Sequence, residues 1–221
     1  MKILMTYGAT RENIDGVRFI TNLSSGATGA ALAGAFAAAG FRVTCLRGLG
    51  SKAPEGRPER DLAFADFSDL DGKLRRLLAS GGFGAVVHLA AVSDYSVKRV
   101  KAGGRWTAPA AGKLPSDAPV LTVELKRNFK LLDRLKAYAA AGGKRKPFVV
   151  GFKLTAGADK ARALEAAAKL AAADLVVHND LRDLGEGRTF GIYRGGARTG
   201  SVRGVKALAR LLKEEIHAAR S

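Results

Sequence analysis

The sequence predicts an α/β protein with a Rossmann-like, doubly wound and mostly parallel sheet, helices on both faces and a C-terminal hairpin. Apolar strand-like runs alternate with helical segments over most of the chain. The strand-like runs are continuously apolar rather than alternating, as expected of strands buried on both faces. The length of 221 residues suits a single domain, which we expect to span residues 1–221.

The first part of the chain is expected to supply strands and helices in alternation. Strands are predicted at residues 2–7, 41–46, 63–67 and 85–91. An alanine-rich helix is predicted at residues 25–39, because Gly40 follows it as a stop signal. A second helix is predicted from the N-cap pair Ser68-Asp69 to Leu78. Residues 49–61 hold prolines and glycines and are expected to form a loop.

The second part continues the pattern after one interruption. Residues 96–119 hold glycines, prolines and many basic residues without a clear period, which predicts a long exposed loop, and such loops are usually functional or disordered. Strands are predicted at residues 121–125, 148–154 and 175–177, and helices at 129–141, 159–173 and 205–219. Residues 189–193 and 199–202 are expected to form the terminal hairpin.

Composition narrows the function classes. The net charge of +17 favours anionic ligands, but Lys and Arg are scattered and aromatic residues make up only 7%, so a nucleic acid is not expected as the main ligand. Cys45 is the only cysteine, so an internal disulfide is excluded. We expect Cys45 to be a buried core thiol. No apolar run reaches the roughly 20 residues of a membrane span, and the first residues are too short for a signal segment, so we expect a cytoplasmic protein without a membrane partner.

Candidate site residues follow the predicted strands, and ligands of doubly wound sheets bind outside these strand ends. After the first strand, the loop from Gly8 leads to a helix start near Ser24 and Ser25, where free backbone amides suit an anion. Taken alone, Ser-Ser-Gly before a helix is also a common capping signal. The spacing is not the G-x-G-x-x-G of dinucleotide-binding proteins.

Two further segments suit a nucleotide. Ala90 and Ala91 end the most apolar strand, and small residues there let a flat ring approach the backbone. Asp94 can accept from ribose hydroxyls or hold a metal ion, or it can simply cap a tight turn. Lys113 on the basic loop can close over phosphates, although a solvated lysine is the common alternative. No spacing of His and Cys suggests a zinc site, and the metal ligands remain unknown.

Taken together, these segments resemble phosphopantothenoylcysteine synthetase, also called phosphopantothenate–cysteine ligase, in its stand-alone form. The resemblance rests on Thr10-Arg11, on residues 17–26 (Val-Arg-Phe-Ile-Thr-Asn-Leu-Ser-Ser-Gly), and on residues 90–95, 113–116, 151–154 and 179–180. The segments occur in the order that the family has, and residues 18–26 are the most specific.

The resemblance implies a two-step ligation in coenzyme A biosynthesis. The carboxylate of 4′-phosphopantothenate attacks the α-phosphate of CTP or ATP, and the amine of L-cysteine then attacks the acyl-nucleotide. It also implies Mg²⁺, a homodimer, and a flavin-dependent decarboxylase as a separate protein. The implied catalytic residues are Asn22, Lys113 and Arg18, the last of which alternatively forms an ion pair with Asp15. The implied nucleotide-binding residues are Gly8, Thr10, Ser24, Ser25, Gly26, Ala90, Ala91, Asp94, Phe152, Lys153 and Asn179.

Three departures from the family pattern leave alternatives open. Ala9, Phe129 and His178 stand where the family often has glycine, proline and alanine, so a divergent member with another acid and amine is one alternative. An NADP-dependent Rossmann reductase is another. The second strand ends in Leu46-Arg47-Gly48, without the acidic residue that NAD-binding proteins place there. A basic nucleic-acid-binding module is the third and would show steep salt dependence.

Overall fold

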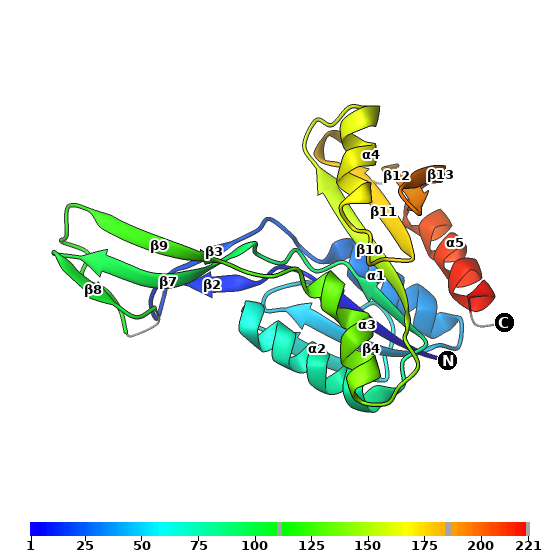
Figure 1. Cartoon of the computed structure of the whole chain (residues 1–221), viewed down its shortest axis with the longest axis horizontal. Coiled ribbons are helices and arrows are strands. Elements are labelled where there is room, and N and C mark those ends of the chain that lie inside the picture. The colour runs from blue at the N-terminus through cyan, green and yellow to red at the C-terminus, as the bar shows by residue number, and fades with distance from the viewer. Residues whose placement is uncertain (110–111, 184–186, 220–221) are drawn as a thin grey trace.

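The computed structural model describes residues 1–109, 112–183 and 187–219. Its body is an eight-stranded sheet with the order β13-β12-β11-β10-β6-β1-β4-β5. The strands in chain order are β1 Lys2–Tyr7, β4 Arg42–Gly48, β5 Arg60–Phe64, β6 Ala85–His88, β10 Phe148–Thr155, β11 Leu175–Asp180, β12 Thr189–Arg194 and β13 Ala197–Arg203. The pairs from β5 to β11 are parallel, and the pairs β11–β12 and β12–β13 are antiparallel. The predicted fold class and C-terminal hairpin are confirmed (Figure 1).

Helices cover both faces of this sheet. The helices are α1 Ala27–Ala38, α2 Phe67–Gly81, α3 Leu135–Ala141, α4 Lys160–Ala168 and α5 Val205–Ala218. Side chains alternate between the faces of a strand, so in β1 Ile3 and Met5 pack with α1 and α5, whereas Leu4 packs with α2 and α3. Because both faces are buried, the strands must be apolar throughout, which explains the continuous runs in the sequence.

The prediction of a loop over residues 96–119 is wrong for its first half. Strands β7 Tyr95–Ala102 and β8 Arg105–Thr107 pair with β9 Leu121–Arg127 in a separate antiparallel sheet of order β8-β7-β9. This sheet extends from the body as an arm (Figure 1). Its strands are joined by cross-strand ion pairs, with the Glu124 carboxylate 2.7 Å from Lys98 Nζ. The strand predicted at residues 121–125 therefore exists but belongs to the arm.

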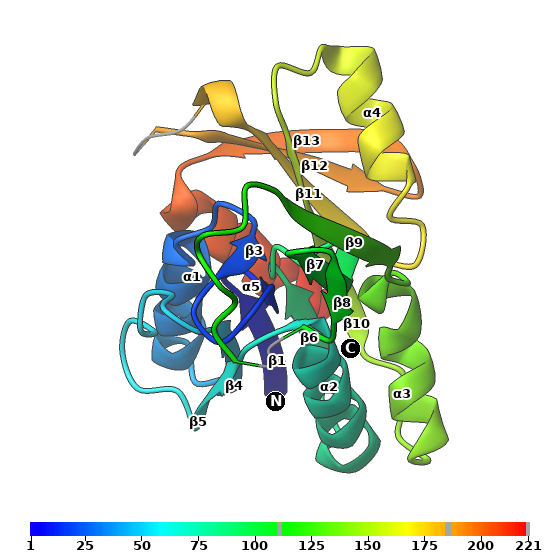
Figure 2. The same cartoon turned by 90° about the vertical axis from the view of Figure 1, so that its left-hand side faces the viewer.

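A short hairpin at the base of the arm was also not predicted (Figures 1 and 2). It consists of β2 Arg11–Asn13 and β3 Phe19–Thr21, which pair antiparallel. Smaller corrections concern boundaries. β5 starts and ends three residues before the predicted 63–67, and residues 129–141 begin with a 3-10 helix at Leu131–Arg134 before α3. Within the described residues, no helix is long and apolar enough to cross a membrane.

Candidate functional site

The ends of β1 and β6 are joined by backbone hydrogen bonds. Thr10 N donates to Ala91 O at 3.3 Å, and Ala91 N donates to Gly8 O at 2.8 Å. The buried hydroxyl of Thr10 accepts from Ser93 N at 3.0 Å. Three of the predicted residues therefore form one platform at the carboxyl edge of the sheet.

Asn22 lies beside this platform. It follows β3, where the Thr21 hydroxyl donates to Thr10 O at 2.8 Å. The Asn22 side-chain amide donates to Ala91 O at 3.3 Å and is exposed. Asn22 thus presents an amide donor at the strand ends, and this donor is held by a long and therefore weak hydrogen bond.

The N-terminus of α1 adds backbone donors at the same edge. Its N-cap is Gly26, which has φ 74° and makes no side-chain capping bond. The hydroxyl of Ser25 accepts only a long bond of 3.4 Å from Ala27 N, and Ser24 and Ser25 are exposed. A twelve-residue helix with an uncapped N-terminus suits a phosphate group.

Glycine is required where these elements meet. Gly8 has φ 82°, and a Cβ atom there would lie 1.9 Å from the Ser51 hydroxyl oxygen. A Cβ atom at Gly26 would lie 2.9 Å from the Tyr7 ring. The loop after β1 and the start of α1 therefore pack closely. Ala9 is buried next to Gly8, and its backbone forms a bridge with Ala91.

A cavity of about 210 Å³ opens between the ends of β6 and β10. Four predicted nucleotide-binding residues line it, namely Ala90, Asp94, Phe152 and Lys153. Phe129 lines it too, although we singled it out only as a departure. Lys130 and Lys169 are lining residues that sequence reasoning missed. Lys130 forms an ion pair of 2.5 Å with Asp94, a link between segments 36 residues apart that no local pattern reveals.

His88 forms the floor of this cavity and is buried. Its Nδ1 lies 2.6 Å from the Thr6 hydroxyl. Burial lowers the pKa of His88 to about 4, so the ring is neutral near pH 7. The cavity therefore combines two phenylalanine rings and a neutral imidazole with lysines at its rim, which suits a flat polar ring carrying anionic groups.

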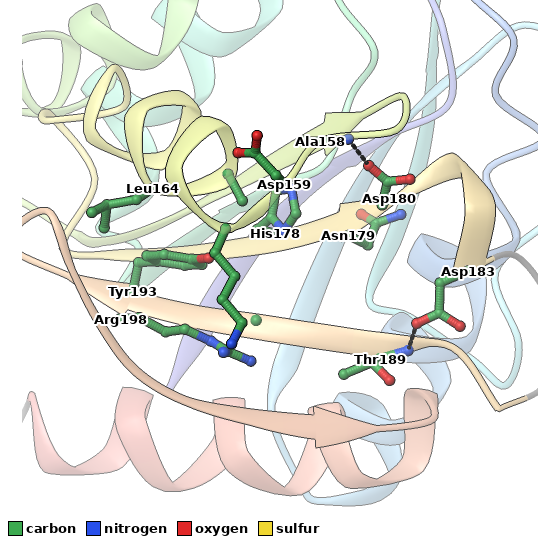
Figure 3. Close-up of a pocket in the computed structure, with 13 residues that line it drawn as sticks. Ala158, Asp159, Leu164, His178, Asn179, Asp180, Asp183, Thr189, Tyr193 and Arg198 are labelled. Carbon is green, nitrogen blue, oxygen red and sulfur yellow. Dashed lines mark hydrogen bonds between the residues drawn. The ribbon is translucent and has the colours of Figure 1, made fainter.

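Asn179 lies apart from this cavity and lines a larger one of about 440 Å³ (Figure 3). Among the predicted site residues only Asn179 contributes to it. The other labelled lining residues come from α4 and the turn before it, from the 3-10 helix after β11, and from β11 to β13: they are Ala158, Asp159, Leu164, His178, Asp180, Asp183, Thr189, Tyr193 and Arg198.

The side chains beside Asn179 are held by each other. His178 Nε2 lies 2.8 Å from the Thr155 hydroxyl, which also donates to Asp180 at 2.7 Å. The pKa of Asp180 is held well below its usual range, first by the Thr155 hydroxyl and then by backbone amides. The departure at His178 therefore has a structural role in joining β11 to β10.

Arg18 and Lys113 belong to a second group, on the arm side. Arg18 lies in the turn between β2 and β3, and its guanidinium is 2.5 Å from the buried carboxylate of Asp15. Lys113 is exposed and precedes Leu114, whose backbone bonds to Asp15 and Arg18. At a rise of about 3.3 Å per residue, the length of β3 separates Arg18 from Asn22 by roughly 13 Å. The structure therefore brings Arg18 and Lys113 together, but away from Asn22.

Two other predictions concern metals and NADP. Within the described part of the chain, no group of three or more His, Cys, Asp or Glu side chains is placed to hold a metal ion. Mg²⁺ bound with a nucleotide needs only one or two carboxylates beside the phosphates, and Asp94 offers one at this edge.

Arg47, at the end of β4, forms an ion pair of 2.9 Å with Asp61 and so does not present a free cation for the 2′-phosphate of NADP.

Comparison with known proteins identifies relatives over almost the whole chain. Residues 1–217 match the family described as the DNA/pantothenate metabolism flavoprotein C-terminal domain. The coenzyme A biosynthesis bifunctional protein CoaBC of Thermococcus kodakarensis is 35% identical over 187 residues, which are 83% of this chain and 42% of that protein. The protein of the same description from Bacillus subtilis is 32% identical over 194 residues, or 84% of this chain and 41% of that protein. The chain thus spans less than half the length of these relatives.

Solved structures share the fold. The DNA/pantothenate metabolism flavoprotein from Streptococcus pneumoniae superposes with a TM-score of 0.85 at 25% identity, covering 99% of both chains. A mutant of Cab2 in complex with phosphopantothenate-cysteine superposes with a TM-score of 0.73, covering 98% of this chain and 85% of that one. At 19% identity the second similarity concerns the fold alone.

Proposed function

Because the chain belongs to the family of DNA/pantothenate metabolism flavoprotein C-terminal domains, we propose that it joins 4′-phosphopantothenate to L-cysteine at the expense of CTP or ATP. The observation that carries the proposal is the platform at the sheet edge, where Gly8, Thr10, Asn22 and Ala91 are hydrogen-bonded together beside the uncapped start of α1. The Cab2 structure, whose bound molecule is phosphopantothenate-cysteine, supports the choice of acid and amine.

The nucleotide is assigned to two neighbouring features. Its phosphates are placed at the amides of residues 25–27 and beside Gly8 and Gly26, where fixed backbone dipoles stabilise negative charge. Its base is placed in the 210 Å³ cavity against Phe152, with Lys153 at the rim. Asn179, on the neighbouring strand β11, lines the separate 440 Å³ cavity and has no nucleotide contact in this placement. Asp94, which pairs with Lys130 in this structure, is the carboxylate that would hold Mg²⁺ beside the phosphates, and the ion would neutralise part of their charge.

Two bond exchanges follow at this edge. A carboxylate oxygen of 4′-phosphopantothenate forms a bond to the α-phosphorus, and the bond to the pyrophosphate leaving group breaks. The cysteine nitrogen, after losing its ammonium proton, then bonds to the acyl carbon, and the bond to the nucleoside monophosphate breaks. The amide of Asn22 donates to the negative charge that develops in both steps. Arg18 and Lys113 supply cations for the anionic groups.

We also propose that two copies pair through the arm. Arm residues include exposed apolar side chains, among them Trp106, Leu121 and Leu125. A second copy can also bring the Arg18 and Lys113 of one chain towards the strand ends of the other. Light scattering on the purified protein tests this proposal, because a monomer at micromolar concentration would contradict it. We propose a flavin-dependent decarboxylase as the partner that takes up the amide product and releases its cysteinyl carboxylate as CO2.

The activity is tested by incubating the protein with 4′-phosphopantothenate, L-cysteine, Mg²⁺ and either CTP or ATP. We expect one pyrophosphate and one nucleoside monophosphate for each amide formed, with the amide identified by mass spectrometry. Pyrophosphate release without cysteine would show formation of the acyl-nucleotide. Thermal stabilisation by NADPH but not by CTP or ATP would contradict the proposal.

A further inference from the structure

One buried carboxylate joins the two arm-side segments that carry Arg18 and Lys113. The side chain of Asp15 is only 1% exposed. Its Oδ1 accepts from the backbone amides of Val17 at 2.9 Å and Arg18 at 2.7 Å. Its Oδ2 accepts from Arg18 Nε at 2.9 Å and Nη2 at 2.5 Å, and from Leu114 N at 3.1 Å. Three backbone amides and one guanidinium therefore satisfy this carboxylate.

The two segments are also joined directly. Arg18 Nη2 donates to Leu114 O at 3.3 Å, and Gly16 N donates to Gly112 O at 3.1 Å. Both backbone groups of Leu114 are thus occupied, one by Asp15 and one by Arg18. Lys113 lies between Gly112 and Leu114, so its backbone is held on both sides while its side chain stays exposed.

We propose that Asp15 is a positioning residue that holds Arg18 and Lys113 together for one anionic group of substrate or intermediate. The inference rests on the proposed ligase function. Arg18 is 39% exposed at its side chain and can turn towards a bound phosphate. Asp15 remains bonded to three backbone amides if Arg18 turns away, so the buried charge is not left without partners. The Arg18 guanidinium, followed by these amides, holds the pKa of Asp15 well below its usual range, and the carboxylate is therefore charged at every usual assay pH.

The first test reads the contact without using activity. Trypsin cleaves after Lys113, and the nitrogen of that same peptide bond is the donor to Asp15. In the full chain, Asp15→Asn should speed cleavage at this bond by about tenfold, the scale of losing one charge-assisted hydrogen bond. Asp117→Asn changes an exposed carboxyl in the same segment and should cleave like the wild type. Unchanged cleavage of Asp15→Asn at this bond would overturn the proposed contact.

The second test asks whether Asp15 acts through Lys113. Asp15→Asn should lower kcat about tenfold with a smaller change in KM for CTP or ATP. Combining it with Lys113→Gln should lower kcat no further than Lys113→Gln alone, because residues that act as a unit are not additive. If the kcat of the double variant instead falls by the product of the two single losses, Asp15 serves only the stability of the turn.

Leu114→Pro provides a second variant if Asp15→Asn does not fold. It removes the same hydrogen bond by deleting the donor and leaves Asp15 and Arg18 in place. Its kcat should fall like that of Asp15→Asn, and a wild-type kcat would overturn the inference. A wild-type chain without ligase activity would instead refute the proposed function, while the cleavage experiment would still decide whether Asp15 holds Lys113.

Discussion

Replacing Asn22 by Asp changes one atom of the proposed site and tests its chemistry most directly. The amide nitrogen that donates to Ala91 O at 3.3 Å becomes a carboxylate oxygen. In the variant, the negative charge of the new carboxylate lies beside both the carbonyl of Ala91 and the bound phosphates. The donor is lost and a repulsion is added.

The expected effects on stability and on rate differ in size. The lost hydrogen bond is long and exposed, so the free energy of unfolding should fall by less than about 1 kcal/mol. Removing one donor to a developing oxyanion costs about a hundredfold in rate, or about 2.7 kcal/mol in activation free energy. Asn22→Asp should therefore unfold close to the wild type yet make product at least about a hundredfold more slowly.

The assay is release of pyrophosphate and of nucleoside monophosphate, with a thermal melt of the same samples. Asn13→Asp is a matched control, because Asn13 is an exposed asparagine in the same hairpin, before Arg18. The control should keep the wild-type rate. Product formation at the wild-type rate by Asn22→Asp would refute the role of Asn22, and an equal loss in Asn13→Asp would show that any added charge in the hairpin has this effect.

Three more predictions follow from the geometry. Lys113→Gln should leave the melting temperature unchanged, because the side chain is exposed, but should slow ligation far more than it weakens 4′-phosphopantothenate binding; single-turnover kinetics would check this, and full activity would contradict the assignment. His88 has a pKa of about 4 when folded against about 6.5 when unfolded, so the unfolded chain binds the extra proton and stability falls as pH drops from 6.5 to 4. In denaturant titrations at several pH values, His88→Asn should remove up to about 3 kcal/mol of this pH-dependent loss in the free energy of unfolding. If the variant shows the same dependence of stability on pH as the wild type, the ring is not held neutral. Gly8→Ala should lower the melting temperature, because φ 82° alone costs about 1–2 kcal/mol and the new Cβ meets the Ser51 hydroxyl at 1.9 Å; Ser51→Gly in the same chain should restore only part of the loss, and full restoration would contradict the backbone strain.

The main sheet was predictable because a strand that is buried on both faces needs consecutive apolar residues, and these are visible in the local sequence. The central strands β1, β6, β10 and β11 are covered on both faces, so their residues had to be apolar in succession. Helix α2 was predicted, but its cap was not: the N-cap is Asp66, whose side chain accepts from Asp69 N, and the predicted cap pair Ser68-Asp69 lies inside the first turn. The expectation of a single domain over residues 1–221 stays a prediction, which one cooperative unfolding transition would support.

The arm could not be read from local pattern. Strand β7 mixes two buried valines with exposed lysine and arginine and carries an irregularity between Val97 and Arg99, which breaks the alternation of a strand. Its partner β9 begins 19 residues after β7 ends, so the pairing depends on tertiary structure. The glycines and prolines of this stretch mark turns but do not show which segments they join.

The sequence predicted individual residues of the candidate site but not which of them lie close together. Residues at strand ends could be placed together, because carboxyl ends of parallel strands share one edge. Arg18 and Asn22 are close in sequence, but the extended strand β3 lies between them. Lys130 and Lys169 were missed because each reaches the cavity from a helix or loop that the sequence does not align with Asp94.

The strand order has a consequence for how this architecture varies. β1, β4, β5 and β6 all come from residues 2–88, and β10 to β13 all come from residues 148–203, so the sheet is two contiguous halves that meet along the β6–β10 ladder. A parallel crossover needs only a dozen or more residues, but here the chain passes through the arm before it returns to the sheet. The arm is thus an insertion at a seam, and its length can change without altering any register within either half. Evolution or engineering can lengthen, shorten or exchange it while the strand ends that hold the candidate site keep their spacing.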